Sequence, residues 1–415
     1  MAGAHIMLRS IIQFTLCTLI TAGLALAAIW PIRLGLADRF FLELTPESTQ
    51  KAIDYMPERS MYQRQLGIFY SMDDPQRSRA ATRRAVELNP FDARAWIELG
   101  LGAELDGDDA TAERELGHAA EVDRGYLPRW ALANYYFRKG DTDKFWLWSK
   151  AAAAMAYEEP TLLFRLCDHV DDKKNLLVGL ELHTPKARKQ YLEYLVDGNH
   201  TGLLGEVALA IARDNLETDT IPLLQSCDRL LAVQKNDEAL QVWNVLAETK
   251  RVPFNPLIVT GSQNVITNGK FTVPPTLHGF DWHWVERNGI IIKPESETGG
   301  LRVSFSGRQP EVCEVLYQLA PVREETRYVF RYGYQTATIA PGTGLLFAIT
   351  NPTGGGVLSA NESLSSDAET QGQLSFTTPP QCKFVRLSLF YHRVLGTTRI
   401  EGSISLQNLT LTAEP

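Results

Sequence analysis

The densest group of chemically capable side chains lies in the stretch HGFDWHW, residues 278–284. Three of its residues are of types that can ligate a metal ion: His278, Asp281 and His283. In a strand, side chains alternate between two faces, so the aromatic residues would form one apolar face: Phe280, Trp282 and Trp284. Such a stripe more often packs in a core. We therefore expect core packing, with sugar stacking by Trp284 or Trp282 and metal binding as alternatives.

Two later segments place arginines beside aromatic rings. In 327–334 the alternation puts Arg331 on the face opposite to the tyrosines, and in 383–393 it separates a polar face from a core face. A guanidinium can take a carboxylate in a fork while a ring lies against a sugar. The candidate glycan-binding residues are therefore Arg331, Arg386, Phe390, His392 and Trp284. The competing interpretation is a solvated outer face whose arginine stems cover apolar surface.

No catalytic motif occurs in the sequence: there is no GxSxG, no glycine loop for phosphate, no HExxH and no CxxC pair. We therefore expect no catalytic residue, no cofactor and no metal site. A glycosidase with two facing acids leaves no local signature, so that possibility stays open. Cys313 and Cys382 each open a strand-like run, and a disulfide between them depends on the proximity of their Cα atoms.

Net charge and hydropathy limit the partners and the location of the chain. The net charge is −8 with no long basic run, which disfavours a nucleic-acid partner. Residues 10–32 carry no charge and are long enough to cross a membrane as a helix. We expect a retained anchor over residues 1–39; the alternative is a signal peptide cleaved near Ala25-Leu26-Ala27. Either way, most of the chain is expected to be exported.

Helical repeats follow the apolar segment. Trp96 and Trp130 are 34 residues apart, and so are Ala119 and Ala153. This period resembles that of the tetratricopeptide repeat, in which small residues let two antiparallel helices approach closely. We expect one continuous helical array over residues 40–250. Such arrays commonly bind a protein partner on their concave face, and the alternative is a spacer without a ligand.

The composition changes near residue 252, where glycine, threonine, serine and proline become frequent. Seven short alternating runs separated by turn residues predict an antiparallel β-sandwich over residues 255–415. The runs are 301–307, 313–322, 327–337, 344–350, 373–379, 383–393 and 402–411.

The segment VITNGKFTVPPTLHGFDWHW resembles the opening of jelly-roll carbohydrate-binding modules. That resemblance implies glycan binding and, in many members, a structural calcium ion. Thr272 stands where those modules carry a glutamate, and Gln407 and Asn408 stand where the last strand is rich in aspartate. Because calcium prefers several carboxylate oxygens, we expect no calcium site.

The expected fold is therefore a transmembrane helix, a tetratricopeptide-like solenoid of α-hairpins and a C-terminal antiparallel jelly-roll sandwich. The combined architecture resembles membrane-anchored repeat proteins of bacterial exopolysaccharide systems. That resemblance implies a non-enzymatic protein of the bacterial inner membrane whose soluble part lies in the periplasm. Its partners would be a protein on the repeats and a polysaccharide on the sandwich. The alternative is an assembly scaffold that binds no sugar.

Overall fold

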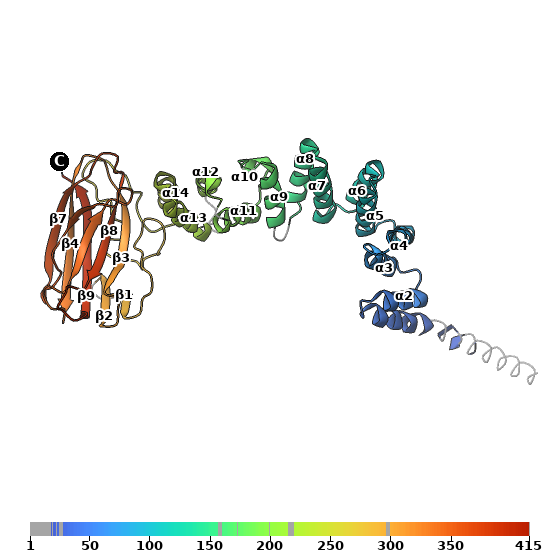
Figure 1. The fold of residues 1–415 in the computed structure, drawn as a ribbon, viewed down its shortest axis with the longest axis horizontal. Helices are drawn as coiled ribbons and strands as arrows, with labels where there is room; N and C mark the ends of the chain where they lie inside the picture. The colour runs from blue at the N-terminus through green and yellow to red at the C-terminus, as the bar shows by residue number, and fades with distance from the viewer. Residues whose placement is uncertain are drawn as a thin grey trace, which may run out of the picture. The chain divides into compact units, whose positions relative to one another are not determined.

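The computed structural model describes residues 18, 20, 21, 23, 24, 28–156, 160–171, 173–198, 200–214, 220–295 and 299–414. Helices come first and strands follow, as expected: the last helix, α14, spans Asn236–Glu248 and the first strand, β1, begins at Ile290 (Figure 1). The chain divides into two compact units, residues 1–182 and 183–415. This boundary falls among the helices, so the last helices belong to the same unit as the sandwich.

The predicted membrane segment, residues 10–32, lies mostly outside the described residues. Residues 28–41 are helical, and the end of this helix packs on α2 and α3 through Ala37, Phe40 and Phe41. Arg33 Nε donates to the Tyr55 carbonyl oxygen at 3.0 Å. In the part of the chain that the structure describes, we find no helix with both the length and the hydrophobicity needed to span a bilayer.

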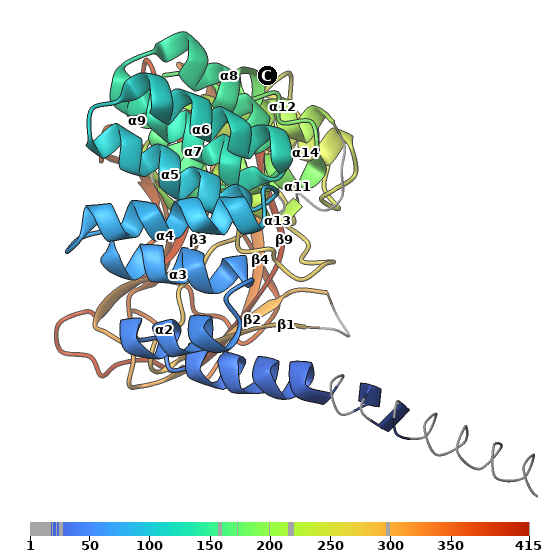
Figure 2. The ribbon, with the colours of Figure 1, turned by 90° about the vertical axis from the view of Figure 1, so that its right-hand side faces the viewer.

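Besides the helix at residues 28–41, the first unit contains nine helices within its described residues, α2 to α10. Consecutive helices pair as hairpins, α3 with α4, α5 with α6 and α7 with α8. The α3–α4 hairpin is seen from the side in Figure 2. Since Trp96 and Trp130 lie in α5 and α7, and Ala119 and Ala153 in α6 and α8, the 34-residue period is the length of one hairpin. The helices are α2 (Pro46–Tyr55), α3 (Ser60–Tyr70), α4 (Pro75–Leu88), α5 (Ala93–Leu105), α6 (Asp109–Val122), α7 (Tyr126–Lys139), α8 (Thr142–Ala153), α9 (Thr161–Val170) and α10 (Leu176–Gly179).

Aspartates and one close glycine contact shape these hairpins. Asp92 and Asp108 cap α5 and α6, each accepting the backbone N–H three residues later, at 3.2 and 3.0 Å. Asp108, in the turn between α5 and α6, is therefore also the N-terminal cap of α6. At Gly100 an added Cβ would lie 2.6 Å from Leu116 Cγ. Glycine thus lets α5 and α6 approach closely, as the repeat pattern predicts.

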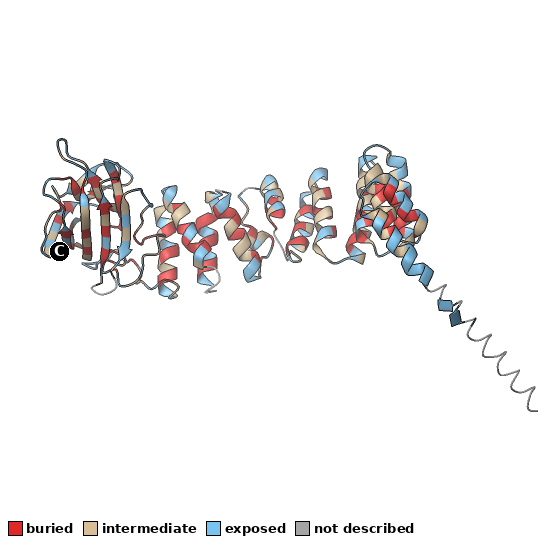
Figure 3. Ribbon diagram, turned by 90° about the horizontal axis from the view of Figure 1, so that it is seen from below, coloured by how far each residue is buried: buried red, intermediate tan, exposed pale blue. Residues whose placement is uncertain are grey.

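Within its described residues, the second unit begins with four helices: α11 (Pro185–Asp197), α12 (Thr201–Arg213), α13 (Thr220–Ala232) and α14 (Asn236–Glu248). Their buried residues form one-sided stripes, whereas burial alternates along the strands (Figure 3). These two periods are those expected of amphipathic helices and of half-buried strands.

The strands form two antiparallel sheets, with the order β1-β2-β9-β4-β7 in one and β3-β8-β5-β6 in the other. All seven predicted runs are confirmed as strands, and β1 and β6 are additional. The side chains between the sheets make a single core. The strands are β1 (Ile290–Pro294), β2 (Leu301–Ser306), β3 (Val312–Pro321), β4 (Arg327–Ala337), β5 (Leu345–Thr350), β6 (Val357–Ala360), β7 (Thr370–Thr377), β8 (Phe384–His392) and β9 (Glu401–Ala413).

The structure decides against a disulfide between Cys313 and Cys382, which are both buried free thiols. Cys313 lies opposite Tyr391, whereas the other end of β3 lies opposite Phe384. Because β3 and β8 are antiparallel, the two thiols sit at opposite ends of the pair. At about 3.3 Å per residue they are roughly 30 Å apart, which is far beyond disulfide reach.

Candidate binding sites

The aromatic segment 278–284 is not a strand but joins the last helices to the sandwich. Its only ladder contact is an isolated bridge between His283 and Tyr317. Leu277 and Gly279 have φ of 61° and 58°, in the left-handed region, so the backbone turns where a strand would continue. The prediction of strand alternation is therefore wrong here, while the expected burial of Phe280 and Trp282 is confirmed.

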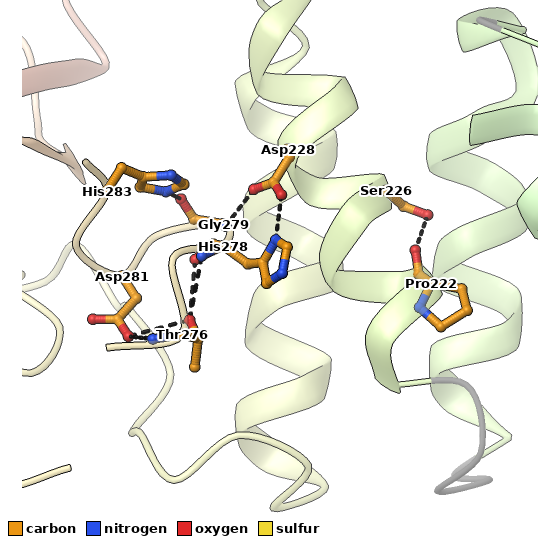
Figure 4. Close-up of polar contacts among 8 residues, drawn as sticks. All are labelled: Pro222, Ser226, Asp228, Thr276, His278, Gly279, Asp281 and His283. Atoms are coloured by element: carbon orange, nitrogen blue, oxygen red, sulfur yellow. Dashed lines mark hydrogen bonds and ion pairs between the residues drawn. The ribbon is translucent and has the colours of Figure 1, made fainter. Parts of the chain in front are cut away.

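A carboxylate on α13 holds this segment (Figure 4). Asp228 accepts from the Gly279 backbone N–H at 2.7 Å and from His278 Nδ1 at 2.5 Å. The hydrogen bond to Asp228 raises the pKa of His278 above its usual value. His283 Nε2 donates to the Gly279 carbonyl oxygen at 2.8 Å, and burial lowers the pKa of His283. The two histidines thus fix a turn of the backbone.

Aromatic packing completes this joint. The Phe280 ring contacts Trp243 of α14 at 6.1 Å between centroids and Phe384 of β8 at 6.0 Å. Trp243 and Phe280 are both fully buried. Asn244 accepts from the Leu257 N–H at 2.8 Å and donates to its carbonyl oxygen at 3.2 Å. The aromatic mass therefore serves core packing, and the core it completes lies between helices and sandwich.

Asp281 is buried beside this joint, and its carboxylate oxygens bind backbone N–H groups of the same segment. Its Oδ2 accepts from the Thr276 backbone N–H at 2.7 Å, and its Oδ1 accepts from the Trp282 N–H at 2.8 Å. Burial raises the pKa of Asp281 to about 6. Among the described residues, no three His, Cys, Asp or Glu side chains gather as a metal site would require.

The outer face of the sheet β3-β8-β5-β6 carries a charged pair. Arg386 donates to both oxygens of Glu314, at 2.8 and 2.5 Å, and Ser388 donates to Glu314 at 2.6 Å. The guanidinium also lies 3.4 Å from the centroid of the Tyr317 ring, on which His283 stacks at 5.0 Å. Arg386 and Tyr317 are therefore already engaged by the protein itself, and no uncompensated positive charge remains there for an acidic glycan.

The five predicted glycan residues do not form one site. Arg331 lies exposed on β4 of the other sheet and donates to Thr412 at 3.2 Å. Its grouping with Arg386 is wrong, because strands β4 and β8 belong to different layers and their outer faces point apart. Phe390 and His392 share the outer face with Arg386, and Trp284 is partly buried against the sandwich core.

The first unit contains a groove of about 440 Å³ along helices α3, α5 and α7. Its apolar lining consists of Ile97, Leu101, Leu127, Trp130 and Ala131. Leu127 is 41% exposed, and Trp130 is half-buried against Tyr126 at 6.1 Å between centroids. The polar lining consists of Arg64, Arg94, Glu98, Asn134 and Arg138. Such a concave apolar surface with a few polar groups is typical of a binding site.

Two of the three arginines in the groove are neutralised. Arg64 pairs with Asp92 at 3.3 Å, and Arg138 takes both oxygens of Glu104 at 2.8 and 2.6 Å. Glu98 accepts no hydrogen bond from the described residues, and burial raises its pKa although Arg64 partly offsets the effect. Glu98 was not predicted from the sequence. The only signal was its position, four residues after Arg94 and three before Leu101 on one face of α5.

No protein-family model matches the chain, and no curated protein matches it. Among solved structures, a CBM4 carbohydrate-binding module is 15% identical and covers 36% of this chain and 99% of its own, with a TM-score of 0.29. YrrB, described as a TPR protein with an unusual peptide-binding site, is 12% identical over 50% of this chain and 94% of its own, with a TM-score of 0.25. PilF of Pseudomonas aeruginosa is 14% identical and covers 46% of this chain and 76% of its own, with a TM-score of 0.23. These likenesses are too weak to assign a family.

Proposed function

We propose that this chain is a non-enzymatic binding protein whose helical repeats capture a segment of a partner protein. The groove between α3, α5 and α7 carries this proposal, because it exposes apolar side chains in a concave surface of about 440 Å³. Covering the exposed Leu127 and the half-buried Trp130 would contribute most to the binding free energy.

A photo-crosslinking experiment tests this function in living cells of the source organism. A benzophenone amino acid replaces Ala131 in the groove of the full chain, and Arg84, exposed on α4, serves as the matched control position. We expect a defined protein adduct from position 131 that Leu101→Glu abolishes, and none from position 84. No adduct from the groove, or the same adducts from both positions, would refute the proposal.

A glycan on the sandwich is the second candidate function. It is supported by Phe390, which lies half-buried in the outer face between Glu314 and Leu346 of the flanking strands. Because Glu314 already neutralises Arg386, a neutral polysaccharide fits this face better than an acidic one.

Calorimetric titration of the full chain with neutral and acidic bacterial polysaccharides tests whether the sandwich binds a glycan and whether it prefers a neutral one. We expect Phe390→Ala to lower the affinity for a neutral polymer about tenfold, because the substitution removes one aromatic contact and the area that it buries. Arg331→Ala, on the opposite sheet, is the control and should change nothing. If no polymer releases heat, the protein-only scaffold becomes the better description.

The cellular setting belongs to the same proposal. Residues 10–32 would hold the chain in a bacterial inner membrane with the rest in the periplasm, as an accessory to polysaccharide production or export. Fractionation of native cells tests the location, and incubation with candidate polymers tests the absence of enzymatic activity. Release of the chain by a salt wash, or the appearance of shortened polymer, would count against it.

A further inference from the structure

The groove of the first unit holds one charged group that the protein leaves without a hydrogen-bond donor. Glu98 is half-buried, and within the described residues no donor reaches its carboxylate. Partial burial costs a carboxylate some of its hydration, and the oxygens of Glu98 stay open to a donor from a ligand, so this group in a cleft is a candidate for ligand recognition.

The remaining charges of the groove define what Glu98 can take. Arg64 and Arg138 are paired with Asp92 and Glu104, so their charges are compensated. Arg94 is exposed at the rim, one helical turn before Glu98. Beside Glu98 lie the apolar side chains of Ile97, Leu101 and Trp130. The open functions are thus an acceptor inside the groove and an apolar surface next to it.

We propose that Glu98 recognises a lysine or arginine of the partner, carried beside a bulky apolar residue that covers Leu101 and Trp130. This inference rests on the proposed function of the groove and specifies the chemistry of its partner. The cation donates to the Glu98 carboxylate, which becomes fully desolvated when the apolar neighbour closes the groove. A charge-assisted hydrogen bond formed there is stronger than at an open surface.

Selection from a phage-displayed library of short random peptides on the immobilised full chain tests the inference. The variants are Glu98→Gln, which keeps the shape and removes the charge, and Trp130→Ala, which removes the apolar wall. Glu87→Gln is the matched control, since Glu87 is exposed on α4 in an ion pair with Arg84. Binding of the selected peptides is then measured by fluorescence anisotropy.

We expect selected peptides to carry a basic residue next to a large apolar one. Their affinity should fall about tenfold or more with Glu98→Gln and with Trp130→Ala, and stay unchanged with Glu87→Gln. Arg94→Gln should raise it slightly, because a repelling charge is removed.

The two ideas fail differently. Peptides that depend on Trp130 but lack a basic residue, or that bind Glu98→Gln as well as the wild type, would overturn the recognition by Glu98 and leave the groove function intact. If no selected peptide depends on Trp130, both are overturned.

Discussion

Gly279 shows how much depends on one residue at the joint between helices and sandwich. Its φ of 58° lies in the region that glycine tolerates best. A Cβ at this position would lie 2.6 Å from Trp243 Cε3, so a side chain meets both backbone strain and an occupied space. The N–H of the same residue donates to Asp228. The close approach of loop and helix therefore requires glycine here.

Gly279→Ala should lower the free energy of unfolding of the second unit by about 2 kcal/mol, through backbone strain and overpacking against Trp243. Denaturant unfolding of the full chain followed by tryptophan fluorescence measures the change. Gly342→Ala is the control, because Gly342 has φ of 71° but nothing within 4 Å of the position that a Cβ would take. Equal losses from both substitutions would mean that the contact with Trp243 contributes nothing.

At the scale of elements, the segment 276–284 of the long connection between α14 and β1 joins helices to a sheet through both polar and aromatic contacts. Asp228 of α13 binds the loop, Trp243 of α14 packs on Phe280, and Phe280 packs on Phe384 of β8. Lys383 adds an exposed ion pair with Asp237 at 2.9 Å, which contributes little. The other titratable group coupled to His278 is His283, which also responds to the charges of Asp228 and Arg386.

The joint should weaken as the pH rises. Because its hydrogen bond to Asp228 raises the pKa of His278, the protonated form contributes stability fully below the unfolded value of about 6.5. That contribution is lost as the pH rises through the higher folded pKa. Hydrogen exchange of residues 276–284 should therefore be faster at pH 8.5 than at pH 6, corresponding to about 1 kcal/mol after correction for the intrinsic rate.

Asp228→Asn removes the charge that raises the pKa of His278 and should abolish most of this pH dependence. It leaves Asp281, whose pKa of about 6 makes the joint lose stability mainly as the pH rises towards 6. It also leaves His283, whose lowered pKa makes the joint gain stability as the pH rises through about 6.5, so the variant should not weaken between pH 6 and 8.5 as the wild type does. His392→Gln, on an exposed histidine of β8, is the control and should keep the wild-type pH dependence. An unchanged profile in Asp228→Asn would exclude the His278 contact as its source.

At the scale of the whole molecule, the sandwich and the helices α11–α14 form one compact unit, residues 183–415. A fragment that starts at the change from helix to strand would expose Phe280, whose ring Trp243 of α14 contacts in the full chain. The chemical boundary in the sequence and the physical boundary of the folded unit are therefore different.

The fragment 255–415 should melt about 10 °C below the fragment 183–415, since each uncovered large apolar side chain costs roughly 1.5–3 kcal/mol. Calorimetry of both purified fragments measures the difference. Phe280→Ser in the shorter fragment is informative: it should improve solubility there, whereas in the longer fragment it should destabilise. Equal melting temperatures of the two fragments would contradict an integral role of the last helices.

Much of this fold could be predicted from the sequence because helix and strand types follow from short periods. The 34-residue spacing of Trp96 and Trp130 located the hairpins, and alternation identified the core face of β8. Burial of Phe280 and Trp282 was also predictable, since large aromatic residues at these positions are costly to expose. These properties depend on residues that are near neighbours in the chain.

Tertiary structure alone decided which surfaces meet. The sheet order places β4 between β9 and β7 and β8 between β3 and β5, so Arg331 and Arg386 lie on different layers despite similar local patterns. The partners Glu314 and Asp228 are 72 and 50 residues from Arg386 and His278. Local periodicity determined what each element is, but contacts between residues distant in the chain depend on strand pairing and helix docking, which no short-range pattern encodes.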